Sequence, residues 1–333
     1  MSAFEQVVLG CVLNACWQLP LIVLLCHLLV RTSPPRVQHR VWLLGTGLAI
    51  LLPMGGLWGL YSQARSVAFA PAAVQPPDLA QRMALAAWVF ASAYAAARFA
   101  RTAIASRRAR RRSTPLGETR GVELRLSPPE LESAGPLLIG IRRPTVLIPV
   151  FLNEPANAGL LRAALAHELA HGRRNDMLAY VLSELALIPL AFHPATWWLR
   201  RRLSESRELA CDEQAARETQ SPIDYARALL EIGRRALQPA PLHSLGVADS
   251  GMLERRIRAL VESPQSWKLT PFRKAVLVLT AGAGIGILTA SARLVYWWLA
   301  EIPQIEVDRL PTGHGRLRAP PPPPPPGKPR RTV

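Results

Sequence analysis

Four long apolar stretches are separated by polar segments along this chain of 333 residues. They cover residues 4–30, 41–61, 83 to about 97, and 275–300. A helix of about 20 apolar residues can cross the roughly 30 Å hydrocarbon core of a bilayer. One such stretch is equally typical of a buried core helix, but four in one chain predict a polytopic membrane protein with about four transmembrane helices.

The segment between the third and fourth stretches has the mixed composition of a globular domain. Alternating apolar and polar residues predict a strand at Val122–Leu126, and residues 136–150 predict a hairpin of two short strands with Pro144 at the turn. Helical patterns cover residues 158–171, 177–190, 197–218 and 224–236. Gly172 is a stop signal for the first of these helices. We therefore expect an α+β fold that is mostly helical.

The net charge of the chain is typical of two classes of protein. Lys and Arg number 40 against 23 Asp and Glu, which gives a formal net charge of +17. This excess is typical of a nucleic-acid binder or of a membrane protein whose basic residues lie in loops on one side. The basic residues flank the apolar stretches: Arg31, Arg36 and Arg40 follow the first, Arg98, Arg101, Arg107, Arg108, Arg110, Arg111 and Arg112 follow the third, and Lys268, Arg273 and Lys274 precede the fourth.

The positive-inside rule makes these three basic segments cytoplasmic, so the N-terminus and the C-terminal tail are expected outside a plasma (inner) membrane. The arginine cluster after the third stretch also suits contact with anionic lipid headgroups. It lacks interleaved aromatic residues and any nucleic-acid-binding motif, so no direct nucleic-acid partner is expected. The four cysteines exclude a disulfide-rich secreted scaffold.

The sequence HELAH carries the first chemical signal, with His167, Glu168 and His171. Residues four apart lie on the same face of a helix, so both imidazoles can reach one metal ion. This is the H-E-x-x-H arrangement of zinc metallopeptidases, in which the glutamate acts as general base. The neighbouring Ala and Leu residues indicate a largely buried helix, where such a polar set without a metal would be costly. One catalytic Zn²⁺ is the expected cofactor.

A catalytic zinc site needs a third protein ligand, and the best candidate is Glu208 in the sequence RELACDE. Asp212, one turn further along the same helix, suits an acceptor for the outer nitrogen of a ligand histidine. Five other side chains compete for roles: Glu205, Glu213, Cys211, His193 and His243. The two carboxylates are more typical of solvated helix charges and the thiol of a small core residue. Spacing alone gives the two histidines no role.

The motifs HELAH, RELACDE and MLERRI, in this order after the hairpin sequence LLIGIRRPTVLIP, resemble the BlaR/MecR-type antirepressor metallopeptidases. The resemblance implies an integral membrane gluzincin in which His167, His171 and Glu208 ligate zinc, Glu168 is the base and Asp212 is the supporting acid. It also implies a peptidase domain that faces the cytoplasm. In that family a signal from outside triggers self-cleavage and the loss of a DNA-bound repressor.

The resemblance covers roughly residues 7–300. The best-known members continue after the last span into a penicillin-binding sensor domain, whereas a short basic tail with seven consecutive prolines follows here, at residues 320–326. Sensing of β-lactams by this chain alone is therefore not expected. We expect a membrane domain with three spans (1–100), a cytoplasmic zinc metallopeptidase domain (101–270), a fourth span (271–300) and a disordered extracytoplasmic tail (301–333).

These observations favour a zinc metalloendopeptidase that cleaves a cytoplasmic protein in signal transduction, either a helix-turn-helix repressor or the chain itself. An edge strand near residues 145–149 would pair with the extended substrate backbone. Two alternatives stay open: a non-catalytic signalling or scaffold protein that retains the zinc site, and a general membrane quality-control peptidase. Turnover of one candidate repressor tests the first alternative, and broad cutting of many proteins would favour the second.

Overall fold

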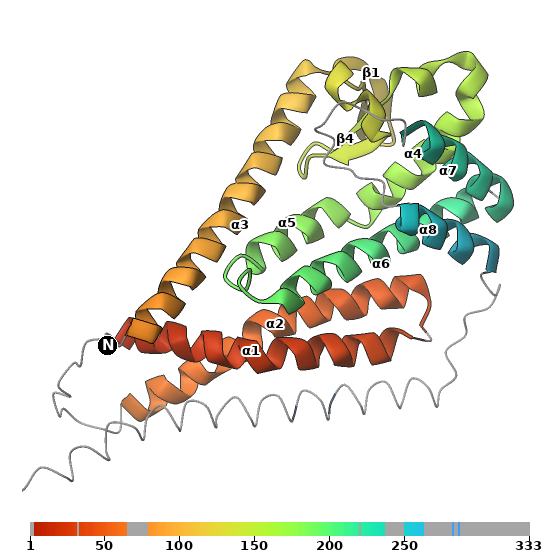
Figure 1. Cartoon of the computed structure of the whole chain (residues 1–333). Helices are drawn as coiled ribbons and strands as arrows, with labels where there is room; N and C mark the ends of the chain where they lie inside the picture. Colours follow the sequence, from red (N-terminus) through yellow and green to blue (C-terminus); the bar gives the residue numbers. More distant parts are fainter. Residues whose placement is uncertain are drawn as a thin grey trace, which may run out of the picture.

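A computed structural model gives the fold of residues 3–31, 33–64, 79–219, 221–236 and 250–262, together with the single residues 282 and 286. Three predicted features lie outside these described residues: the fourth apolar stretch apart from those two single residues, the tail with its proline run, and His243. Helices dominate, and a small sheet lies at one end of the molecule (Figure 1). This is the mostly helical α+β class that the sequence predicts.

The first two apolar stretches form long helices that pack against each other as a hairpin (Figure 1). α1 covers Ala3–Val30 and α2 covers Pro35–Ala64. Leu19, Ile22 and Trp42 are at most 1% exposed in the core that the two helices share. The helices predicted at residues 4–30 and 41–61 are confirmed.

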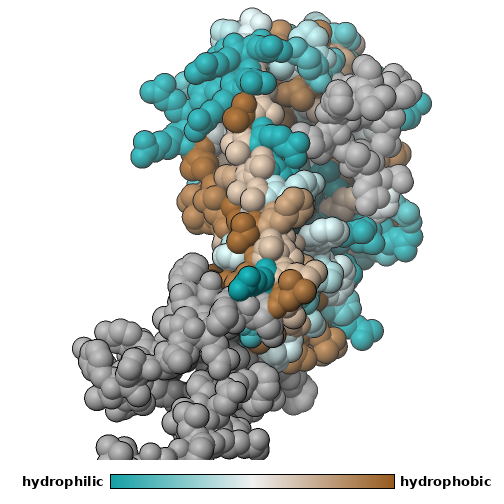
Figure 2. All heavy atoms as spheres, turned by 60° about the vertical axis from the view of Figure 1, so that its left-hand side comes forward, coloured by the Kyte–Doolittle hydropathy of each residue, from teal (hydrophilic) through white to brown (hydrophobic). Residues whose placement is uncertain are grey.

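α3 covers Leu79–Arg112 and contains the third apolar stretch. It continues through the arginine cluster, because Ala and Arg are both strong helix formers, so the cluster is the end of a helix. Val89, Phe90 and Tyr94 are exposed along its middle. On the face in Figure 2, hydrophobic residues gather over the middle and hydrophilic residues at the upper end. Among the described residues, α3 and the segment Val8–Val30 of α1 are long and apolar enough to cross a membrane.

The sheet contains four short strands in the order β1-β2-β4-β3. These are β1 Thr114–Thr119, β2 Val122–Leu126, β3 Leu137–Ile139 and β4 Thr145–Ile148. β3 and β4 form the predicted antiparallel hairpin, with Leu138 opposite Val146, and β4 also pairs in parallel with β2. The sequence analysis did not predict β1, in which the register shifts between Pro115 and Gly117.

The expectation of an edge strand at residues 145–149 is wrong. β4 lies between β2 and β3, and all four of its residues are buried. The edge on this side of the sheet is β3, where Leu137 is 41% exposed. The hairpin pattern identifies two neighbouring strands, but it does not show which of them a more distant strand joins.

Five helices follow the sheet in the described part of the chain: α4 Ala158–Arg173, α5 Asp176–Ala186, α6 Pro194–Glu218, α7 Pro222–Ala236 and α8 Ser250–Glu262. Three short 3₁₀ helices lie between β2 and α4, at Pro129–Ala134, Val150–Asn153 and Pro155–Asn157. The helices α4 to α7 were predicted and α8 was not. Gly172 does not end α4; the chain turns at Asn175, whose φ is +55°. Leu169 of α4 packs with Val146 of the sheet.

α6 joins the helical hairpin to the part of the fold around the sheet (Figure 1). Leu199 is fully buried in the core of the hairpin. Further along α6, the Ser206 Oγ atom lies 3.3 Å from the Nδ1 atom of His39 in α2. Glu213 then forms an ion pair of 3.0 Å with Arg36, close to the start of α2. α6 therefore contacts α2 at several levels before and after the position of Glu208.

Candidate metal centre

Three side chains predicted as metal ligands converge between α4 and α6. The Nε2 atoms of His167 and His171 are 3.2 Å apart, and the Oε2 atom of Glu208 lies 3.3 Å from the first and 3.8 Å from the second. Ligand atoms about 2.1 Å from a tetrahedral zinc ion are about 3.4 Å from one another. The donor types and their spacing therefore fit one Zn²⁺ with a fourth position open.

Small residues bring the ligand-bearing helices close together. Ala163 of α4 packs with Ala215 and Ala216 of α6, and all three are at most 5% exposed. Without longer side chains between them, the two backbones approach closely enough for histidines on one helix to meet a carboxylate on the other. The i, i+4 spacing of the histidines directs both rings toward α6.

Asp212 contacts the His167 ring at the nitrogen that faces away from Glu208. Its Oδ1 atom lies 3.0 Å from the Nδ1 atom of His167, opposite the Nε2 atom that faces Glu208. The Tyr225 hydroxyl donates to the same carboxylate oxygen at 2.7 Å. Arg256 of α8 donates from Nε to Oδ2 at 2.7 Å and from Nη2 to Oδ1 at 2.8 Å. The carboxylate is thus held in one orientation, from which it can orient the His167 ring.

Asp176 plays the corresponding part for the second histidine. Its Oδ2 atom lies 2.9 Å from the Nδ1 atom of His171, and Arg174 holds the same carboxylate at 3.2 Å. The Cys211 thiol, fully buried, also donates to it at 3.0 Å. Both ring Nδ1 atoms of the centre therefore face carboxylates, which leaves both Nε2 atoms for a metal ion.

Cys211 belongs to the outer side of the centre. Its sulfur lies 3.2 Å from the Nδ1 atom of His171, the nitrogen that faces Asp176. Together these three residues form a second group of donor atoms within 4.8 Å of one another. The ring cannot donate to Asp176 from Nδ1 and bind a metal through the same atom, so the geometry favours the His-His-Glu group as the metal site.

The surroundings of both imidazoles favour positive charge. Burial disfavours a charged ring, but hydrogen bonds to Asp212 and Glu208 raise the pKa of His167. At His171, burial is outweighed by hydrogen bonds to Asp176 and further neighbours, which raise the pKa of this ring well above its ordinary value. The centre therefore stabilises a cation between these groups, whether protons or a metal ion.

The carboxylates of the centre are ionised at neutral pH. Burial opposes the charge of Glu208, but its contacts with the two histidines hold its pKa well below the usual range. Burial likewise opposes the charge of Asp212, and Arg256 outweighs it and lowers the pKa of this carboxyl. The pKa of Asp176 is lowered to about 2, because the hydrogen bond from His171 and other contacts outweigh burial. An ionised carboxylate can accept the hydrogen bonds described above but cannot donate them.

A cleft of about 780 Å³ opens over the centre. His167, Glu168, His171 and Glu208 line it together with the edge strand β3. Glu168 is only 5% exposed and follows the first ligand on α4. The predicted base therefore shares one cleft with the three predicted ligands.

The competing residues lie in different places. Glu205 lines the cleft and pairs with Arg255 at 2.8 Å. Glu213 pairs with Arg36 of α2, away from the centre. His193 accepts a hydrogen bond from the Ala195 backbone amide at the start of α6 and does not line the cleft.

Comparison with known proteins agrees with this geometry. Residues 60–260, more than half of the chain, match the sequence model of the BlaR1 peptidase M56 family. The chain belongs to the BlaR1 peptidase M56 family. One relative is the "Regulatory protein BlaR1" of Bacillus licheniformis, which is 31% identical over 77 residues. That match covers 23% of this chain and 13% of the relative. The family is one of peptidases, and the His-His-Glu group fits the metal site of a metallopeptidase.

Sequence reasoning missed three residues that hold the centre of this M56-family chain together. Arg256 lies within the MLERRI motif, but nothing in the motif assigns it a partner 44 positions away. Asp176 starts α5 directly after the turn at Asn175, and an acidic residue at that place is also common as a helix start. Tyr225 is the fourth residue of α7, and no local pattern distinguishes it from a core residue.

Proposed function

We propose that this chain is a membrane-embedded zinc metalloendopeptidase that cleaves a cytoplasmic protein in signal transduction. Its substrate is a helix-turn-helix repressor, the chain itself, or both. One observation carries the proposal: ligand atoms 3.2 to 3.8 Å apart share a single cleft with Glu168. Membership of a peptidase family supports the same reading.

Each residue of the centre has a separate role in the proposed reaction. His167, His171 and Glu208 would hold Zn²⁺, and Asp212 and Asp176 would fix the two rings. Zinc, when bound, supplies Lewis acidity toward a peptide carbonyl and lowers the pKa of water. Glu168 takes the proton of the attacking water and returns it to the leaving amine, a general acid–base role worth about 10²- to 10⁴-fold in rate.

The edge strand β3 is the proposed place for the substrate backbone. In the described sheet it pairs with β4 on one side only, and its residues line the cleft together with Glu168. An extended peptide can add to such an edge through main-chain hydrogen bonds, while neighbouring pockets select side chains. This assignment replaces the expected edge at residues 145–149.

The replacement of Glu168 by Gln tests the proposal. We expect Glu168→Gln to keep stoichiometric zinc and to lose cleavage of a candidate repressor and of itself, measured by mass spectrometry of the fragments from protein purified in detergent. Glu130→Gln is the matched control, because Glu130 is an exposed carboxylate that pairs with Arg112 at 2.8 Å. Unchanged cleavage by Glu168→Gln would refute the catalytic role. A zinc-loaded wild-type protein that cuts neither substrate would favour the non-catalytic alternative.

The orientation belongs to the same proposal. We place the N-terminus outside, the peptidase domain in the cytoplasm and the C-terminal tail outside the plasma membrane. Support comes from the basic end of α3, where Arg110, Arg111 and Arg112 follow the apolar part of the helix. A topology reporter fused to the N-terminus should be active outside the membrane, and activity in the cytoplasm would overturn the orientation.

A further inference from the structure

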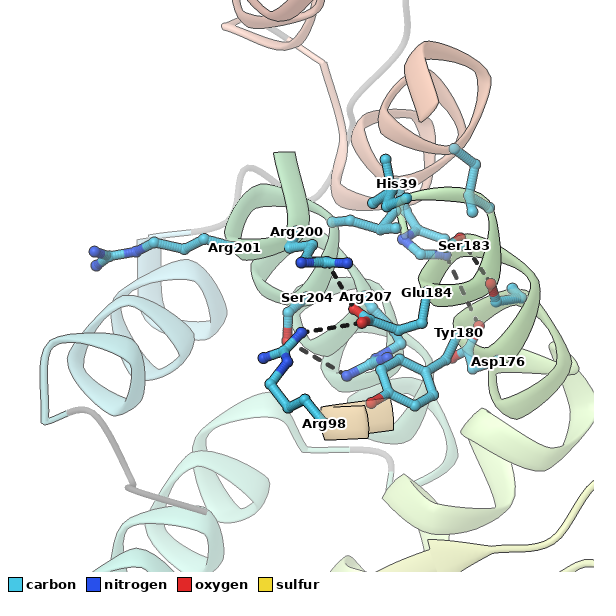
Figure 3. A pocket seen from close by; sticks show the side chains of 14 residues that line it. His39, Arg98, Asp176, Tyr180, Ser183, Glu184, Arg200, Arg201, Ser204 and Arg207 are labelled. Atoms are coloured by element: carbon cyan, nitrogen blue, oxygen red, sulfur yellow. Dashed lines mark hydrogen bonds and ion pairs between the residues drawn. The ribbon is translucent and has the colours of Figure 1, made fainter. Parts of the chain in front are cut away.

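A second, smaller cavity of about 300 Å³ adjoins the metal cleft. Four helices supply its walls: His39 and Leu43 come from α2, Arg98 from α3, and further side chains from α5 and α6. Figure 3 shows arginines from α3 and α6 converging on a carboxylate of α5. The two cavities share five lining residues, among them Asp176, so the smaller one reaches the carboxylate that fixes a predicted zinc ligand.

Two arginines pair with one glutamate in this cavity, and a third arginine lines the same wall. Arg98 Nη2 lies 3.1 Å and Arg200 Nε 3.3 Å from the carboxylate of Glu184 (Figure 3). The guanidinium of Arg207 lies over the Tyr180 ring, 5.6 Å from its centroid. Arg200 is only 14% exposed, so its charge is poorly solvated and depends on the groups inside the cavity.

Positive charge is in excess along the walls. The charged lining residues are Arg98, Arg200, Arg201 and Arg207 against Asp176 and Glu184. Asp176 already accepts from His171 and Arg174. Arg201 pairs with Glu205 and Arg207 with Glu208, so Arg98 and Arg200 are the two arginines that share the single carboxylate of Glu184. Burial and nearby arginines lower the pKa of His39 to about 4, so this ring adds no charge at neutral pH. The cavity therefore offers a cationic, partly enclosed site to an anion.

The position of the cavity along the apolar helices indicates which anion it takes. Arg98 is the first residue after the apolar stretch 83–97, and Leu43 is the third residue of the stretch 41–61. If both stretches cross the bilayer, these two ends place the cavity at the level of the lipid headgroups. This level suits the phosphate of a lipid better than it suits a free ion or an acidic peptide.

We infer that this cavity binds the phosphate of an anionic phospholipid. Arg98 and Arg200 contact the phosphate oxygens, and the acyl chains extend from the mouth of the cavity toward the bilayer. The inference rests on the membrane location in the proposed function. Because Asp176 belongs to both cavities, the bound lipid lies next to the support of His171.

The test is lipid retention by the full-length protein. Protein is extracted from nanodiscs of phosphatidylcholine with or without phosphatidylglycerol, and bound lipid is counted by native mass spectrometry. We expect wild type to retain phosphatidylglycerol, and Arg98→Gln and Arg200→Gln to weaken retention about tenfold each. Arg101→Gln is the matched control, because Arg101 is an exposed arginine one turn further along α3 that does not line the cavity.

A variant that should bind more lipid distinguishes a lost binding site from a misfolded protein. Glu184→Gln removes the competing negative charge but keeps an oxygen acceptor, so we expect it to retain phosphatidylglycerol more tightly than wild type. Equal retention by wild type and Arg98→Gln, an equal loss in Arg101→Gln, or weaker retention by Glu184→Gln would overturn the site. Displacement of the lipid by inorganic phosphate alone would identify a free-phosphate site and would overturn the assignment to lipid.

The zinc site is measured on the same samples, so the two proposals fail separately. Loss of the lipid signal with zinc content and cleavage intact refutes only the lipid site. Absence of cleavage in wild type with selective lipid retention refutes the peptidase proposal and leaves the lipid site standing.

Discussion

Arg256 is the residue whose removal should reveal most about how the metal centre is held together. It donates two hydrogen bonds, of 2.7 and 2.8 Å, to Asp212, which is only 2% exposed. Breaking a buried ion pair costs about 3 to 5 kcal/mol, because the remaining charge is left without its partner. Tyr225 and His167 still contact the carboxylate, so we expect a value near the lower limit, about 3 kcal/mol for Arg256→Gln.

Thermal unfolding in detergent measures this loss. For a domain of about 150 to 250 residues, each kcal/mol shifts the midpoint by about 2 to 4 °C, so Arg256→Gln should unfold about 6 to 12 °C lower. Arg255→Gln is the matched control: Arg255 is 50% exposed, and its partner Glu205 keeps ion pairs with Arg201 and Arg202, so we expect a loss of at most about 1 kcal/mol. The difference between the variants should persist with a chelator, since the ion pair itself needs no metal.

The double variant decides whether the pair is the cause. Asp212→Asn together with Arg256→Gln removes both charges, so it should be more stable than Arg256→Gln alone. Equal midpoints for Arg256→Gln and Arg255→Gln would refute the reasoning. A double variant that loses the sum of the two single effects would show that the two side chains act independently.

Three further variants test the centre. Glu208→Gln should lose zinc in a metal-binding assay, whereas Glu213→Gln, five positions along the same helix, should keep it; equal zinc content would contradict the ligand assignment. Asp176→Ala should weaken zinc binding about 10- to 100-fold in a chelator competition because the His171 ring loses its acceptor, and unchanged affinity would show that the ring needs no such support. Cys211→Ala should keep full zinc content and lose about 1 kcal/mol of stability in a denaturant titration; a loss of zinc would place the thiol among the ligands.

The convergence of the predicted ligands could be foreseen because it depends on one helical period. His167 and His171 share a face of α4 by spacing alone, and Glu208 needed only a helix that returns to them. Their roles as ligands remain predictions. Arg256 and Tyr225 could not be assigned, since α7 and α8 reach Asp212 through tertiary packing that no local pattern encodes.

The order of the strands in the sheet, in contrast, could not be predicted from local sequence patterns. The hairpin of β3 and β4 is local, and its residues predicted it correctly. The parallel pairing of β2 with β4 joins segments that are separated by a 3₁₀ helix and a whole strand, and it decides which strand becomes the edge. The error about residues 145–149 followed from this long-range pairing.

The contacts of α6 with α2 hold α6 on both sides of Glu208. Ser206 touches His39 two positions before Glu208, and Glu213 binds Arg36 five positions after it. A helix transmits a displacement along its axis with little loss, because each turn is closed by its own hydrogen bonds. Any shift of α2 along α6 thus acts on both sides of a predicted metal ligand, so the position of the Glu208 carboxylate depends in part on how α2 lies against α6.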